Sequence, residues 1–112
     1  MKKLHNLSEK DEKAVQLASE ILREKFPVQK VILFGSKARG DDDEESDIDL
    51  LLLTNRMITW EERKAVIDSL FDIELACDVV ISPLISTSSE WNEGMFSVMP
   101  IHNEISREGI PM

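Results

Sequence analysis

The feature that most limits how this chain can fold is the segment SDIDLLLL, residues 46–53, in which two aspartates at alternate positions precede four leucines. A strand with one exposed face alternates apolar and polar residues, whereas unbroken leucine predicts a strand covered on both faces. We therefore expect a buried strand from Asp47 to Thr54. Its acidic start marks the place where that covering ends.

Helical and strand patterns alternate along the rest of the chain. Apolar residues recur at helical spacing from Glu9 to Lys25, after a capping residue at Ser8, and the run KVILF (30–34) predicts a strand that Gly35 ends. Further elements are expected as a helix from Trp60 to Ile73, a third strand over CDVVIS (77–82) closed by Pro83, a short helix from Glu90, and a last helix from Pro100 to near Gly109. This order predicts an α/β (α+β) fold in one domain, residues 1–112, with a small mixed sheet flanked by helices.

Composition excludes several classes of partner. The formal net charge of -9 argues against sequence-independent binding to a polyphosphate backbone, so we expect no nucleic acid partner. The single cysteine, Cys77, excludes an internal disulfide and fits a reducing compartment. Because no apolar run approaches the roughly 18 residues that span a bilayer, we expect no membrane contact and a cytoplasmic location.

The paired acids Asp47 and Asp49 predict a metal site. Residues two apart on a strand point the same way, with Cα atoms roughly 6 to 7 Å apart, so the two carboxylates share a face. Mg²⁺ commonly binds one or two carboxylates and completes its octahedron with waters and substrate phosphates. A phosphate-binding element is therefore expected nearby.

The segment GSKARG, residues 35–40, fits that expectation. Gly35 lets the backbone approach a ligand closely, and Ser36 adds a hydroxyl donor. Lys37 and Arg39 can neutralise phosphate charge, and the guanidinium can do so bidentately. A Gly-Ser turn that leads into a paired-Asp strand is a much stronger signal than either part alone.

A third carboxylate is expected from Asp78 if the predicted 77–82 strand lies beside the Asp47 strand. Two metal ions about 3.5 to 4 Å apart could then stabilise the attacking and leaving oxygens of a phosphoryl displacement, with Asp78 as a ligand or as the base that deprotonates the attacking hydroxyl. The consecutive acids from Asp41 to Glu45 are better explained as a solvated loop than as a surface that recruits or excludes ligands.

These segments together resemble the minimal nucleotidyltransferase branch of the DNA polymerase beta superfamily. The resemblance covers GSKARG, the acids of SDIDLLL and CDVVI, and the closing HNEISREGI, and ten residues, 37–46, separate Gly-Ser from Asp47 as in the antitoxin members. It implies a polymerase-beta-like core that uses ATP and Mg²⁺. It further implies that Gly35 and Ser36 grip the triphosphate, that Asp47 and Asp49 ligate Mg²⁺, and that Asp78 is the third carboxylate.

The resemblance also implies a biological role. Members paired with a HEPN-domain ribonuclease toxin transfer AMP to a tyrosine of that toxin and so act as antitoxins, which implies a hetero-oligomer with the toxin. Two alternatives stay open from the sequence. One is a binding module that blocks a toxin stoichiometrically while the motif only binds ATP, and the other is an antibiotic nucleotidyltransferase.

Overall fold

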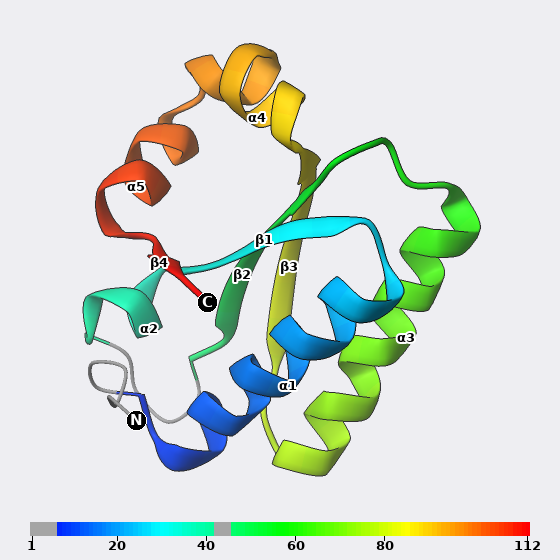
Figure 1. The fold of residues 1–112 in the computed structure, drawn as a ribbon. Coiled ribbons are helices and arrows are strands. Elements are labelled where there is room, and N and C mark those ends of the chain that lie inside the picture. The colour runs from blue at the N-terminus through cyan, green and yellow to red at the C-terminus, as the bar shows by residue number, and fades with distance from the viewer. Residues whose placement is uncertain (1–6, 42–45) are drawn as a thin grey trace.

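A four-stranded sheet lies at the centre of the computed structural model, which describes residues 7–41 and 46–112 (Figure 1). The helices are α1 (Glu9–Lys25), α2 (Ser36–Arg39), α3 (Trp60–Cys77), α4 (Ser88–Glu93), the 3-10 helix η1 (Met95–Val98) and α5 (Pro100–Glu108). The strands are β1 (Val28–Phe34), β2 (Ile48–Thr54), β3 (Ile81–Thr87) and β4 (Ile110–Pro111). Most of the acidic run, residues 42–45, falls outside the described residues, so the prediction of a solvated loop there stays a prediction.

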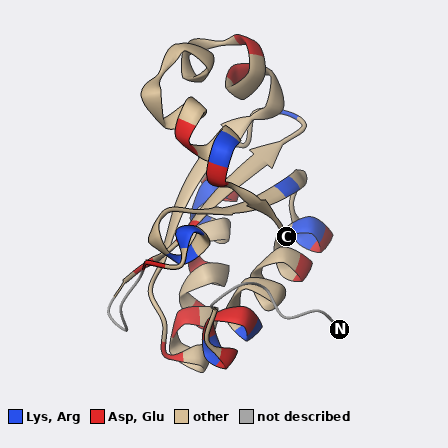
Figure 2. Ribbon diagram, turned by 90° about the vertical axis from the view of Figure 1, so that its left-hand side faces the viewer, with Lys and Arg blue, Asp and Glu red and all other residues tan. Residues whose placement is uncertain are grey.

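The strand order in the sheet is β3-β2-β1-β4. β1 pairs antiparallel with β2 and with β4, whereas β2 pairs parallel with β3, so the predicted mixed sheet is confirmed. Helices α1 and α3 lie together on one side of the sheet, and α4 and α5 lie away from them (Figure 1). In Figure 2 the strands are mostly tan and the charged positions gather on helices, as expected for a sheet with covered faces.

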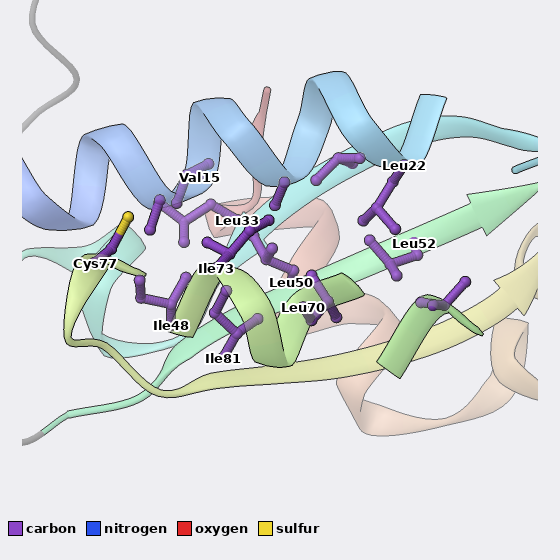
Figure 3. Close-up of a cluster of buried hydrophobic side chains, with 14 of the residues drawn as sticks. Val15, Leu22, Leu33, Ile48, Leu50, Leu52, Leu70, Ile73, Cys77 and Ile81 are labelled. Atoms are coloured by element: carbon purple, nitrogen blue, oxygen red, sulfur yellow. The ribbon is translucent and has the colours of Figure 1, made fainter. Parts of the chain in front are cut away.

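Strand β2 is buried on both faces, as its leucine run predicts. Ile48, Leu50 and Leu52 face the larger core, where they meet side chains of α1 and α3 (Figure 3). Leu51 and Leu53 face a smaller cluster that includes Trp91 of α4 and Ile105 of α5. The alternation of strand side chains therefore places odd-numbered residues of β2 on the α4 and α5 side.

The two terminal helices confirm the sequence predictions closely. Helix α1 has the predicted bounds, and the Ser8 hydroxyl accepts a hydrogen bond from the backbone N–H of Asp11. Helix α5 begins at Pro100, and Gly109 follows its last residue. The short helix α4 begins two residues earlier than predicted and is capped by Thr87.

The third strand was predicted in the wrong place. Residues 74–77, predicted to lie partly in a loop and partly in that strand, continue α3, because Glu, Leu and Ala favour a helix and Asp78 adopts the left-handed conformation that ends it. The strand itself starts at Ile81 and contains Pro83, which was expected to close it. β3 is an edge strand, where a residue without an N–H is tolerated.

Within the described residues, no helix is both long enough and apolar enough to cross a membrane. The cytoplasmic location stays a prediction.

Candidate active site

The paired acids lie where the covering of β2 ends. Asp49 is the second residue of β2 and is partly buried, whereas Asp47 directly precedes the strand and is exposed. Asp49 lies on the sheet face that carries Leu51 and Leu53 and that α5 covers further along. Asp47 lies near enough for its charge to act on Asp49, and the common face of the two carboxylates stays a prediction.

The two carboxylates influence each other electrostatically. Burial raises the pKa of the Asp49 carboxyl, and the negative charge of Asp47 raises it further. The positive charge of Arg39 acts in the opposite direction. Two acids that repel and one nearby cation make this strand end a place that favours an additional positive charge.

Gly35 brings backbone into direct contact with that acid. It has a φ of 78° and a ψ of -158°, a combination that residues with a Cβ rarely adopt. A Cβ built at this position would lie 2.3 Å from Oδ2 of Asp49. The antiparallel register, which pairs Phe34 with Asp49, sets this approach. The Gly-Ser turn and the acidic strand start are thus neighbours in space.

The turn continues directly into α2, a four-residue helix that the sequence did not predict. The carbonyl of Gly35 accepts from the N–H groups of Ala38 and Arg39, and Gly40, with a φ of 82°, ends the helix. Ser36, its first residue, is partly buried. The segment predicted to bind phosphate is therefore a short helix with a glycine at each end.

Arg39 extends from α2 toward the same side as the acids. Its Nε donates to Oδ2 of Asp41 at 3.0 Å, and its Nη1 donates to Oε1 and Oε2 of Glu108 at 3.1 and 3.3 Å. The Arg39 side chain is 46% exposed, so solvent and ligands can reach it. The predicted role of Arg39 in neutralising phosphate stays a prediction.

Lys37 lies elsewhere, in contrast to the prediction. Its Nζ donates to Oδ2 of Asp11 at 2.7 Å, and both side chains are almost fully buried. Asp11 belongs to α1, on the opposite side of the sheet from Glu108. The Lys37 ammonium is therefore held inside the protein and does not face the acids of β2.

Asp78 does not join the paired acids either. It follows the last residue of α3 in a left-handed conformation, and its side chain is fully exposed, with Oδ2 at 3.8 Å from Nζ of Lys10. The argument for a third carboxylate required the 77–82 strand, which the structure does not contain. Among the described residues, no group of three or more His, Cys, Asp or Glu side chains could hold a metal ion.

Two partners of the site escaped sequence reasoning, Asp11 and Glu108. Asp11 lies in line with the buried stripe of α1, at positions 11, 14, 15, 18, 19 and 22. A charged residue on an apolar stripe is a readable sign of a buried ion pair. Glu108 gave no comparable sign, because an acid near the end of an exposed helix is ordinary.

A cavity of about 480 Å³ lies at the other end of β2, near Thr54. Its walls include Ile58, Ile85 and Phe96, with Arg63 and Glu90 beside them. Thr54 lies five positions after Asp49 along the strand, which corresponds to roughly 17 Å. The cavity is therefore distinct from the acidic site.

The profile of the nucleotidyltransferase domain family matches residues 15–91, a span that includes Gly35, Asp47 and Asp49. The chain belongs to the nucleotidyltransferase domain family. This confirms the class of enzyme predicted from the sequence.

Named relatives agree with the family. Two proteins of Methanocaldococcus jannaschii, each named as a candidate protein adenylyltransferase, are similar to the chain. MJ0141 is 48% identical over 67 residues, which cover 60% of this chain and 66% of the relative, just under two thirds of its length. MJ0604 is 33% identical over 101 residues, which cover 88% of this chain and 94% of the relative.

Solved structures confirm the fold. A toxin-antitoxin structure with AMP-PNP superposes with a TM-score of 0.61 at 18% identity, covering 86% of this chain and 69% of the other. The toxin-antitoxin structure MntA-HpeT superposes with a TM-score of 0.54 at 21% identity, covering 84% and 67%. The predicted nucleotidyltransferase core is therefore present.

Proposed function

We propose that this chain transfers AMP from ATP to the hydroxyl of a tyrosine on a partner HEPN toxin and thereby acts as an antitoxin. The observation that carries the proposal is the contact between the two halves of the motif. The backbone of Gly35 lies against the carboxylate of Asp49 in a chain of the nucleotidyltransferase domain family. A triphosphate bound at the Gly-Ser turn would then lie beside both acids.

The donor set fits Mg²⁺. Burial raises the pKa of Asp49 and the negative charge of Asp47 raises it further, so a divalent cation bound by these two carboxylates would be stabilised. Two carboxylates, with waters and phosphate oxygens, suit the octahedral preference of this ion. When bound, Mg²⁺ would neutralise charge that develops on the phosphate oxygens. Asp78 has no assigned part, because it lies apart from these acids.

The residues of α2 and its turn would position the nucleotide. In this proposal Gly35 allows the close backbone approach, the Ser36 hydroxyl donates a hydrogen bond to the triphosphate, and Arg39 neutralises phosphate charge. The tyrosine oxygen forms a bond to the α-phosphorus as the bond between the α-phosphorus and the bridging oxygen breaks. AMP is thereby joined to the tyrosine, and pyrophosphate and the tyrosine proton are released.

A protein acceptor is favoured over a small molecule or a nucleic acid. MJ0604, similar over 94% of its length, is named for protein adenylylation, and the fold resembles that of toxin-antitoxin structures. The net charge of -9 disfavours a polynucleotide, while a small acceptor needs a pocket that buries most of its surface. The cavity near Thr54, described above, lies at the opposite end of β2 from the acids. A protein acceptor would form part of the acceptor site with its own surface.

The test is to incubate the chain with ATP, Mg²⁺ and the candidate toxin and to weigh the toxin by intact-mass spectrometry. We expect the mass to increase by whole AMP groups. Asp47→Asn and Asp49→Asn should each abolish this increase. Asp68→Asn is the matched control, because Asp68 is an exposed acid of α3 that pairs with Lys64.

Two results would change the proposal. A toxin that stays unmodified but is silenced by one-to-one binding would favour the binding module. Activity within tenfold of the parent in both Asp47→Asn and Asp49→Asn would remove these acids from the mechanism.

A further inference from the structure

The buried ion pair between Asp11 and Lys37 is the starting observation. Nζ of Lys37 lies 2.7 Å from Oδ2 of Asp11, and the side chains are only 4% and 5% exposed. Burial of a charge is unfavourable unless an opposite charge and hydrogen bonds compensate it. Each member of this pair therefore fixes the position of the other.

Asp11 has no other evident task in α1. It belongs to the first turn, where acids often interact with free backbone N–H groups, but its own N–H donates to Ser8 and its carboxylate turns inward to Lys37. It stands on the core-facing stripe with Ala14 and Val15. An apolar residue would suit that stripe better, so we attribute the acid at this position to its ion pair with Lys37.

Helix α2 depends on contacts of this kind for its position. A helix of four residues has too few internal hydrogen bonds to be stable alone. Lys37 ties it to α1, Arg39 ties it to α5 through Glu108, and Ala38 packs against the larger core. Of the pairs with Asp11 and with Glu108, the one with Asp11 is the buried one.

The position of α2 in turn sets the site. Its first residue, Ser36, follows Gly35, whose backbone lies so near Asp49 that a Cβ would meet the carboxylate oxygen. A shift of α2 by a fraction of an ångström would change the gap that a triphosphate and a cation must share. Misplacement of about 1 Å can lower a rate by roughly a hundredfold.

We infer that Asp11 is a positioning residue for nucleotide binding. Through Lys37 it holds the Gly-Ser turn at its working distance from Asp49. The inference rests on the proposed function, because it assigns the turn and Asp49 to the triphosphate. It also gives Lys37 an internal role in place of phosphate contact.

The test uses AMP-PNP with Mg²⁺ as the probe and calorimetry as the measurement, so it needs no acceptor. Asp11→Asn should weaken AMP-PNP binding at least tenfold at a temperature where the variant stays folded. Leu22→Ala is the matched control: Leu22 is a fully buried residue of α1, about 16 Å along the helix from Asp11. Leu22→Ala should lower the unfolding temperature but keep the parent affinity for AMP-PNP. A loss of affinity in Asp11→Asn could then not be explained by a general loss of stability.

A rescue separates positioning from phosphate contact. The double variant Asp11→Leu with Lys37→Met replaces the pair by apolar side chains, an exchange that buried ion pairs often tolerate. It should bind AMP-PNP within about threefold of the parent. If it binds as weakly as Asp11→Asn, Lys37 acts on nucleotide binding by a route other than its pair with Asp11, and the inference is wrong.

The remaining outcomes are also decisive. If Asp11→Asn does not fold, Asp11→Glu takes its place, since the added methylene moves the carboxylate but keeps the charge. Parent affinity in a folded Asp11 variant overturns the inference and leaves the proposed function standing. If the parent chain binds no AMP-PNP, the proposed function fails, and this inference fails with it.

Discussion

Lys37 and Arg39 carry the same charge on one four-residue helix, two positions apart, yet they meet opposite layers of the protein. Lys37 pairs with Asp11 of α1 and is 4% exposed, whereas Arg39 pairs with Asp41 and with Glu108 of α5 and is 46% exposed. Breaking a buried pair leaves an unpaired charge and costs about 3 to 5 kcal/mol, whereas exposed pairs exchange partners with water readily. Burial therefore decides which cation is fixed in the structure and which one a ligand can recruit.

Among substitutions in α2 and its turn, the largest effect is expected at Gly35, where the turn meets the acid. Gly35→Ala should lower kcat/KM by at least about a hundredfold, because the new Cβ would displace the Asp49 carboxylate. The backbone conformation adds strain on the order of 1 to 3 kcal/mol. Steady-state kinetics and thermal unfolding measure the two effects separately.

Gly94→Ala is the control for Gly35→Ala. A Cβ at Gly94 would meet a carboxylate oxygen of Glu90 at 2.4 Å, a similar clash far along the chain from the site. It should reduce stability while the transfer rate per folded molecule stays at the parent value. Equal activity loss in both variants would mean that the approach of Gly35 to Asp49 has no special part.

The second prediction concerns the exposed cation. Arg39→Met should weaken AMP-PNP binding roughly tenfold or more, because charge-assisted hydrogen bonds to phosphate are lost. Thermal stability should hardly change, since the guanidinium is reached by water. Lys64→Met, which removes another exposed pair, should change neither quantity. A large drop in unfolding temperature for Arg39→Met would mean that Arg39, like Lys37, is fixed in the structure by its ion pairs.

The sequence predicts the parts of this comparison that follow from periodicity. The α1 stripe and the leucines of β2 both specify local structure, and each was found as predicted. The common face of Asp47 and Asp49 is a prediction from strand geometry alone. These features need no knowledge of distant residues.

The burial of Lys37 could not be predicted in that way. It depends on a contact between residues 26 positions apart, and Lys37 and Arg39 have equivalent sequence signals. The predicted position of β3 was wrong for a related reason. Pro83 is acceptable only on an edge strand, and which strand lies at the edge is a property of the whole sheet. Contacts between distant segments therefore determined the burial of Lys37 and the position of β3, which local sequence patterns do not specify.

The third prediction extends the comparison to an exposed acid, Asp78. Asp78→Asn should keep transfer activity within about tenfold of the parent, because the side chain is fully exposed and apart from the paired acids. Asn also tolerates the left-handed conformation that ends α3, so the fold should be unaffected. If activity falls as far as in Asp49→Asn, Asp78 acts as the third carboxylate after all.

The smallest effect is expected at another exposed pair, Glu62 with Arg56. Because protonation removes the charge of Glu62, pH can test directly how little an exposed ion pair contributes to stability. Hydrogen bonds from Arg56 and from the Thr59 backbone N–H lower the pKa of Glu62 from its ordinary value of 4.5 to about 2. A carboxyl with a lowered pKa stabilises the folded state above its ordinary pKa and loses that contribution as pH falls toward the folded value.

Glu62→Gln keeps an oxygen for the Thr59 N–H but removes the charge. Its unfolding temperature should therefore lie slightly below that of the parent at neutral pH, and the difference should vanish between about pH 4.5 and pH 2. Glu61→Gln, a change at an exposed acid of the same turn, controls for the general effect of charge. A difference that persists unchanged at pH 2 would show that packing, and not the exposed ion pair, is what the substitution removes.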